Sequence, residues 1–372
     1  IGYRHLGDGY REGRLGQLFV MELADGVSRR LVEGPFDVRS LSWSPDSRRL
    51  AYAAKAEADL GLNLNEDLWV VDRDGGEPVR LTRNPGIDRD PRWFAADELA
   101  YLRTENPLWE SAPKTITVLD PAEGEAGGLE FHPGGLDDFF WQYDATGGRF
   151  HVLKAERGCL DLVRVEGEEH VRLTDGGHDF WSLEVGGDRA VLQGSGQTLP
   201  GGIFTVDLSR KDAAAPELVI DPNEAWRRQV ELVEPERFEI EVEGRGIEGW
   251  FFKPIGLQEG ERVPVVLSIH GGPQWMYGGY FLPEFHILPR YGFGVVIATP
   301  TGSMGYGTEF MKGVRFDWVD RPARELMACL DYAVELGWAD PDRMAVMGGS
   351  YGGHLGAALT TQSDRFGAAA LD

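Results

Sequence analysis

Hydrophobic and polar positions alternate in short runs between turns over residues 1 to about 222, a pattern typical of antiparallel strands. Four segments repeat one order: a strand with a tryptophan, a turn, and a second apolar strand. They read "LSWSPDSRRLAY", "PRWFAADELAY", "FFWQYDATGGRFHVL" and "FWSLEVGGDRAVL", and their tryptophans, at spacings of 50, 48 and 40 residues, are Trp43, Trp93, Trp141 and Trp181. A plain β-sandwich accounts for the strands but not for the repeated order.

A second hairpin with a short apolar run follows each of these segments. The four hairpins read "LWVVDRDGGEPVRLT", "ITVLDPAEGEAGGLE", "DLVRVEGEEHVRLT" and "IFTVDLSRKDAAAPELV", and a fifth copy, "QLFVMELADGVSRRLV", stands near the N-terminus. Four strands in every 40–50 residues are typical of β-propeller blades. The pattern therefore predicts a β-propeller over residues 1–222, with about four blades and part of another. Because propellers close to avoid exposed edges, we expect further blades before Ile1.

The pattern changes after residue 222. Residues 223–235 are charged and predict a linker or a short helix, and "FEIEVEGRGIEGWFFKP" then alternates as an antiparallel pair. The continuous apolar runs "VPVVLSIH", "GFGVVIATP" and "RMAVMGGS" are typical of strands covered on both faces. "RELMACLDYAVELG" has apolar residues at helical spacing between Asp320 and Gly337, and "GGHLGAALTTQ" predicts a second helix. This alternation predicts a parallel α/β sheet in residues 236–372.

Composition excludes several classes of protein. A formal net charge of −24 argues against a nucleic-acid binder, because phosphates are held by clustered Lys and Arg. Cys159 and Cys329 lie far apart, so we predict buried thiols in a reducing compartment rather than a disulfide or a metal site. No apolar run reaches the ~20 residues of a membrane helix. We therefore predict a cytoplasmic protein without membrane contact, and because the sequence begins with Ile1 rather than Met, we also expect a segment before it.

The stretch "VMGGSYGGHLG" contains a G-x-S-x-G motif in which Ser350 lies between a buried strand and a helix. A nucleophilic serine at such a strained turn needs glycines beside it, so that neighbouring backbones can pass without Cβ atoms. A glycine-rich turn can also bind phosphate, but the strand and helix on either side favour a nucleophile. We predict Ser350 as the nucleophile, with Gly348 and Gly352 supporting the turn.

The stretch "SIHGGPQW" ends an earlier buried strand, where backbone N–H groups can face a substrate carbonyl. An oxyanion hole needs two such donors, and we predict the N–H groups of Gly272 and Tyr351. Gly271 supports this loop. His270 precedes the serine, so we interpret it as a hydrogen-bonding anchor rather than a general base.

The usual order in this fold is Ser, then Asp or Glu, then His. After Ser350 the chain offers Asp364, Asp372 and His354. His354 lies one turn along the predicted helix, so its side chain should point away from the hydroxyl, and Asp364 is interpreted as a helix-end residue. We therefore expect the Asp and His of the triad beyond residue 372.

The motifs "WSPDSRRLAY", "HGGPQW", "PTGSMGYGTEF" and "GGSYGG" together resemble the prolyl oligopeptidase family of serine peptidases, and most closely its acylaminoacyl-peptidase branch. The resemblance implies a seven-bladed β-propeller that covers an α/β-hydrolase domain, whose N-terminal part is residues 236–372. It assigns residues 301–307 to the site wall and places the missing Asp and His roughly a hundred residues beyond the chain. Thr301 stands where many relatives carry arginine, and the acidic pairs with which dipeptidyl peptidases hold a free amine are not evident.

We accordingly expect a serine peptidase that hydrolyses short peptides through an acyl-enzyme on Ser350 and releases N-acylated amino acids from blocked peptides. The joined domains suggest that the propeller roofs the site and admits only short peptides. No metal or organic cofactor is implied, and the resemblance is compatible with a homo-oligomer. A general oligopeptidase or aminopeptidase, or an esterase of the same fold, stays open. So does a propeller-based binding protein with an inert hydrolase domain.

Overall fold

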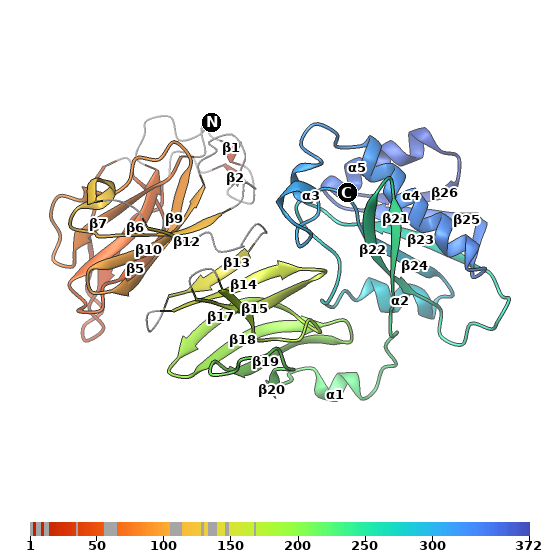
Figure 1. Cartoon of the computed structure of the whole chain (residues 1–372), viewed down its shortest axis with the longest axis horizontal. Helices are drawn as coiled ribbons and strands as arrows, with labels where there is room; N and C mark the ends of the chain where they lie inside the picture. The colour runs from red at the N-terminus through yellow and green to blue at the C-terminus, as the bar shows by residue number, and fades with distance from the viewer. Residues whose placement is uncertain are drawn as a thin grey trace. The chain divides into compact units, whose positions relative to one another are not determined.

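The computed structural model describes residues 3–4, 9–10, 15–34, 36–55, 65–104, 114–127, 130–132, 140–145, 149–166 and 169–372 (Figure 1). The chain forms two compact units, which are described separately. The first comprises Ile1–Leu136, Asp144–His151 and Val165–His170, and the second comprises Asp137–Tyr143, Val152–Arg164 and Val171–Asp372.

Two four-stranded antiparallel sheets make up most of the first unit. Their strands are β5 (Asp37–Trp43), β6 (Arg49–Lys55), β7 (Asp67–Asp72), β8 (Val79–Arg80), β9 (Ile87–Ala95), β10 (Glu98–Thr104), β11 (Thr115–Leu119) and β12 (Glu130–His132). Each of the two predicted tryptophan segments forms the first two strands of a sheet. Trp93 is buried among side chains of both sheets, including Leu68 and Tyr101, so the two sheets share one apolar core.

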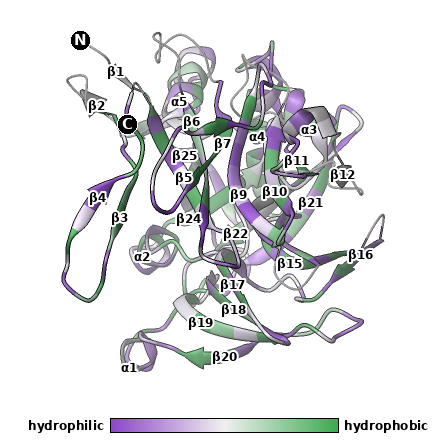
Figure 2. Cartoon of the chain, turned by 90° about the vertical axis from the view of Figure 1, so that its left-hand side faces the viewer, coloured by the Kyte–Doolittle hydropathy of each residue, from purple (hydrophilic) through white to green (hydrophobic). Residues whose placement is uncertain are grey.

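Short hairpins precede these sheets. β1 (Tyr3–Arg4) pairs with β2 (Gly9–Tyr10), and β3 (Phe19–Met21) pairs with β4 (Ser28–Arg30). The β3–β4 hairpin is the fifth, incomplete copy of the repeat that the sequence predicts. Figure 2 shows apolar β3 beside charged β4, and Phe19 and Met21 are more than half exposed.

Two further four-stranded sheets follow, and the second lies wholly within the second unit. Their strands are β13 (Phe140–Asp144), β14 (Phe150–Glu156), β15 (Cys159–Glu166), β16 (Glu169–Arg172), β17 (Asp179–Gly186), β18 (Arg189–Gly196), β19 (Leu199–Asp207) and β20 (Glu217–Ile220). Residues 146–148 of the predicted "ATGG" turn lie outside the described residues. Strand order thus repeats four times, as the tryptophan pattern predicts.

The C-terminal sheet has the strand order β21-β22-β24-β23-β25-β26. Its strands are β21 (Glu236–Val242), β22 (Arg245–Phe252), β23 (Val263–Ile269), β24 (Gly294–Thr299), β25 (Ala339–Gly348) and β26 (Phe366–Leu371). β22 pairs antiparallel with β21 and β24, whereas β24, β23, β25 and β26 run parallel. Every residue of β24 is buried, as its unbroken apolar run predicts.

The helices are α1 (Glu224–Arg227), α2 (Glu284–Arg290), α3 (Thr308–Lys312), α4 (Asp320–Glu335) and α5 (Tyr351–Gln362). α4 begins at Asp320 as predicted, and Gly337 with φ 86° follows its end. The sequence pattern did not predict α2, α3 or β26. These elements are short, and β26 and α2 lack the periodic or bounded apolar runs that mark the others.

The two cysteines are free buried thiols, as predicted, and burial raises the pKa of both. None of the helices in the described residues has the length and apolarity to cross a membrane. Among these residues, no group of His, Cys, Asp and Glu is arranged to hold a metal ion.

Candidate active site

The turn between β25 and α5 holds Ser350 in a left-handed conformation, with φ 55° and ψ −120°. A serine rarely adopts this region, and such strain is concentrated at functional sites. The Ser350 N–H donates to the Asp372 carbonyl over 2.7 Å, and the Asp372 N–H donates to the Gly348 carbonyl over 3.1 Å. Asp372, the residue after β26, thus holds the turn through two backbone hydrogen bonds. Ser350 itself is exposed at the carboxyl edge of the sheet.

Close backbone packing explains three glycines around this turn. A Cβ on Gly352 would lie 2.1 Å from the Ile269 carbonyl oxygen, and one on Gly348 would lie 2.6 Å from the Gly352 backbone. A Cβ on Gly353 would lie 2.3 Å from the Asp372 carbonyl oxygen. Gly349 differs, because a Cβ there would meet no atom within 4 Å.

The loop after β23 lies against the same turn. A Cβ on Gly271 would lie 3.7 Å from the Ser350 Cβ, and Gly272 has φ 117°. The N–H groups of Gly272 and Tyr351 donate to no carbonyl of the described residues. Tyr351 also opens α5, whose N-terminus favours negative charge. The structure thus brings the predicted segments together, and the role of the two donors as an oxyanion hole stays a prediction.

His270 links two loops of the site. Its Nε2 lies 2.9 Å from the Ser303 Oγ, and its Nδ1 lies 2.7 Å from the Gly271 carbonyl oxygen. Burial lowers its pKa from 6.5 to about 4, so the ring is neutral near pH 7. With both nitrogens occupied, the ring has the geometry of an anchor rather than of a base.

His354 lies on α5 and is exposed, with its ring centroid 6.3 Å from that of Trp318. Asp364 follows the end of α5 at Gln362. In the described part of the chain, the Ser350 side chain makes no capping hydrogen bond to α5. The location of the triad Asp and His beyond residue 372 stays a prediction.

Residues 301–307 are held by two buried glutamates that the sequence analysis missed. The Thr301 N–H and hydroxyl donate to the Glu325 carboxylate over 2.6 and 2.7 Å. The Tyr306 hydroxyl donates to the Glu248 carboxylate over 2.6 Å. One signal for Glu325 was available in the sequence: this acidic residue stands next to Leu326, which belongs to the apolar positions of the helix α4. Thr301 is therefore buried and bonded within the protein.

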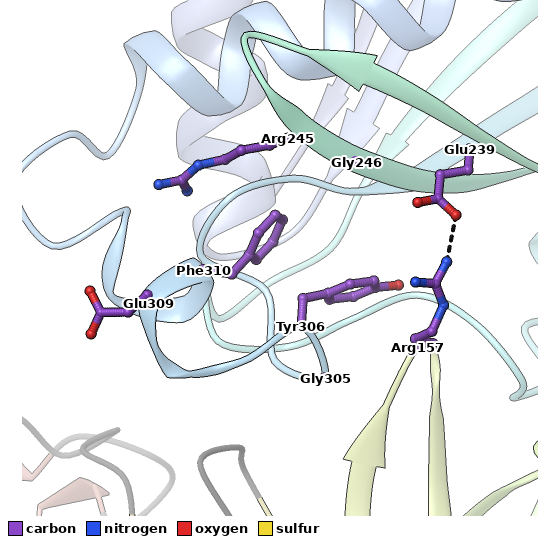
Figure 3. Close-up of a pocket in the computed structure, with 8 residues that line it drawn as sticks. All are labelled: Arg157, Glu239, Arg245, Gly246, Gly305, Tyr306, Glu309 and Phe310. Carbon is purple, nitrogen blue, oxygen red and sulfur yellow. Dashed lines mark hydrogen bonds and ion pairs between the residues drawn. The ribbon is translucent and has the colours of Figure 1, made fainter.

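Two pockets flank these loops. A pocket of about 500 Å³ borders the ends of β23 and β25, with Trp275, Tyr277 and Tyr280 among its lining residues. Its aromatic walls are fixed by bonds between Ser268 and Tyr277 and from the Trp275 indole to Tyr280. A second pocket of about 430 Å³ is bordered by the end of the 301–307 loop. Its lining residues are Arg157, Glu239, Arg245, Gly246, Gly305, Tyr306, Glu309 and Phe310 (Figure 3).

Several known proteins are similar to this chain in sequence. The uncharacterized peptidase YuxL of Bacillus subtilis is 26% identical over 396 residues, which cover 99% of this chain and 58% of that protein. Dipeptidyl-peptidase 5 of Porphyromonas gingivalis is 22% identical over 90% of this chain and 52% of its own length. The chain thus spans little more than half the length of these relatives.

Among solved structures, the Pyrococcus horikoshii acylaminoacyl peptidase in its orthorhombic form superposes with a TM-score of 0.68. The two sequences are 21% identical, and the superposition covers 95% of this chain and 66% of the Pyrococcus chain. At this identity the likeness shows the fold, and the predicted class, a β-propeller followed by an α/β-hydrolase domain, is confirmed. Residues 280–372 match the model of the prolyl oligopeptidase family. The resemblance to this family that the motifs predict is therefore confirmed over residues 280–372.

Proposed function

We propose that this chain belongs to a serine peptidase that hydrolyses short peptides through an acyl-enzyme on Ser350 and releases N-acylated amino acids from blocked peptides. The observation that carries the proposal is the Ser350 turn. A non-glycine residue with φ 55° stands between a buried strand and a helix, and the Gly271–Gly272 loop packs against it. A structural turn has no need of a strained, exposed serine at this position.

The reaction begins when the Ser350 hydroxyl oxygen attacks the scissile carbonyl and a histidine beyond residue 372 takes its proton. The negative oxygen of the tetrahedral intermediate accepts hydrogen bonds from the Gly272 and Tyr351 N–H groups. The same histidine protonates the leaving amine, which leaves an acyl group on Ser350. Water, deprotonated by the histidine, then attacks the acyl carbonyl and regenerates the serine.

The likeness to the Pyrococcus horikoshii acylaminoacyl peptidase supports the blocked-peptide substrate. A second candidate, removal of dipeptides from free N-termini, is favoured by the relative named dipeptidyl-peptidase 5. An esterase activity and an inert, binding role are the remaining alternatives. Cytoplasmic location and homo-oligomer formation stay predictions.

The test compares two matched chromogenic amides in the full-length protein, one N-acetylated and one with a free amine, with Ser350→Ala as the blank. Fluorophosphonate labelling of Ser350 is measured on the same preparations. We expect labelling, and faster hydrolysis of the acetylated amide, both lost in Ser350→Ala.

Equal rates on the two amides, or a faster rate on the free amine, would keep the serine peptidase and reject the blocked-peptide specificity. Labelling with hydrolysis of esters alone would identify an esterase. Folded wild-type protein that is not labelled would reject the hydrolase and favour a binding protein.

A further inference from the structure

The turn between β14 and β15 reaches the loops of the candidate site. Arg157 and Gly158 form this two-residue turn, with φ values of 47° and 82°. Two successive residues in the left-handed region are typical of a type I′ hairpin turn. Arg157 is exposed, whereas Gly158 is buried although it lies at a hairpin tip. A buried tip indicates that the turn packs against other parts of the second unit.

Backbone hydrogen bonds join this turn to both site loops. The Arg157 N–H donates to the Gly305 carbonyl over 3.0 Å, and the Gly279 N–H donates to the Gly158 carbonyl over 2.7 Å. Between the loops, the Met304 N–H donates to the Trp275 carbonyl over 3.2 Å. The turn thus pairs on one side with the 301–307 loop and on the other with residues 276–279.

The contact leaves no room for side chains. A Cβ on Gly278 would lie 1.8 Å from the Gly158 carbonyl oxygen, and one on Gly158 would lie 2.7 Å from the Trp250 ring. The turn of the neighbouring β17–β18 hairpin shows that this closeness is not a property of hairpins. Gly187 there also has a positive φ, 62°, but a Cβ on it would meet nothing within 4 Å.

Charged side chains reinforce the same junction. Figure 3 shows the Arg157 guanidinium beside the Glu239 carboxylate, with the Tyr306 phenol directed toward it. The Arg157 Nε also lies 3.9 Å from Glu248, the buried carboxylate that accepts the Tyr306 hydroxyl bond. The turn therefore meets the 301–307 loop through its backbone and through an ion-pair cluster.

From the 301–307 loop the contacts continue to the nucleophile. Ser303 bonds the His270 ring, and His270 precedes Gly271, which packs against Ser350. We propose that the β14–β15 turn positions the loop that carries the oxyanion donor Gly272. Arg157 and Gly158, which belong to a propeller blade, are then positioning residues for the reaction in the hydrolase domain. This inference rests on the proposed function.

The test uses the full-length protein and Gly158→Ala, with Gly187→Ala as the matched control. Both changes place a Cβ at a positive φ in a hairpin turn, and only the first disturbs the site loops. The readouts are the rate constant of fluorophosphonate labelling at Ser350, kcat and KM on one amide, and the unfolding temperature. Gly158→Ala should lower the labelling rate and kcat by about ten- to a hundredfold, because misplacement by about 1 Å costs on the order of 10²-fold. KM should change less.

A purely structural role would lower the unfolding temperature of both variants and leave labelling well below that temperature unchanged. Equal labelling rates in the two glycine variants would therefore overturn the inference. Wild-type protein that is not labelled would instead overturn the proposed function, and this inference with it.

If Gly158→Ala does not fold, the charged part of the junction provides the same test. Arg157→Met removes an ion pair whose side chains are 48% and 51% exposed, and Arg324→Met removes the Arg324–Glu243 pair, at 52% and 45%. Arg157→Met should slow labelling about threefold, in line with the energy of one exposed pair, and Arg324→Met should not. Equal rates in these two variants would contradict the inference.

Discussion

The Ser350 turn and the 301–307 loop lie in the same candidate site, but different forces hold them. Residues 348–352 are held by backbones that approach each other where glycines leave out the Cβ, as Gly352 does against Ile269. The 301–307 loop is held by side-chain hydrogen bonds to buried groups from distant elements. Steric packing of this kind is insensitive to pH and intolerant of added atoms, whereas a polar network depends on the protonation of its members.

The largest expected effect tests the packed turn. In Gly352→Ala the new Cβ has no space beside the Ile269 carbonyl, so the turn must shift. We expect Ser350 labelling to fall by about 10²-fold and the free energy of unfolding to fall by about 1–3 kcal/mol. Labelling kinetics and urea denaturation measure the two quantities.

Gly349→Ala is the matched control, because its Cβ would enter open space. Its free energy of unfolding should stay within about 0.5 kcal/mol of the wild-type value. A loss as large as that of Gly352→Ala would show that general strain of the turn, rather than the contact with Ile269, requires glycine.

An effect of similar size tests the polar loop through pH. Burial holds the pKa of His270 at about 4, compared with 6.5 for an ordinary histidine. Between these values the unfolded chain binds a proton that the folded protein does not. The contribution of His270 to stability is therefore fully present above pH 6.5 and is lost as the pH falls toward 4, by up to about 3 kcal/mol.

Urea denaturation of the wild type and of His270→Gln, over a pH series spanning that window, isolates this contribution, because other titrating groups are common to both. The variant should lose less stability on acidification than the wild type. Parallel pH profiles would show that His270 is already accessible to protons in the folded protein.

The same difference explains what could be predicted from sequence. Glycines that permit close packing lie next to the serine, so Ser350, Gly348 and Gly352 could be identified from a local motif. The same holds for the blades, because turns and alternating strands repeat along the chain.

The groups that hold the 301–307 loop carry no local signal. Glu325 is 24 residues from Thr301, and Glu248 is 58 residues from Tyr306. Only the packing of α4 and the pairing of β22 with β24 bring these residues together. The Arg157 turn was missed for the same reason, because its partners belong to another domain of the predicted fold.

The smallest effect concerns one member of the polar network. Glu325→Gln keeps the size of the side chain but replaces one of the two oxygens that accept hydrogen bonds from Thr301. A hydrogen bond to a charged group contributes about 1.5–3 kcal/mol, and we expect a net loss of about 1–2 kcal/mol in the free energy of unfolding. Glu224→Gln, at an exposed carboxylate of α1, makes the same chemical change and should cost less than about 0.5 kcal/mol.

Because burial raises the pKa of Glu325, the wild-type carboxylate carries a desolvation cost that the neutral amide avoids, and this gain opposes the lost bond. Variant and wild type of equal stability near neutral pH would contradict this expectation and would mean that the lost hydrogen bond and the avoided desolvation cost cancel.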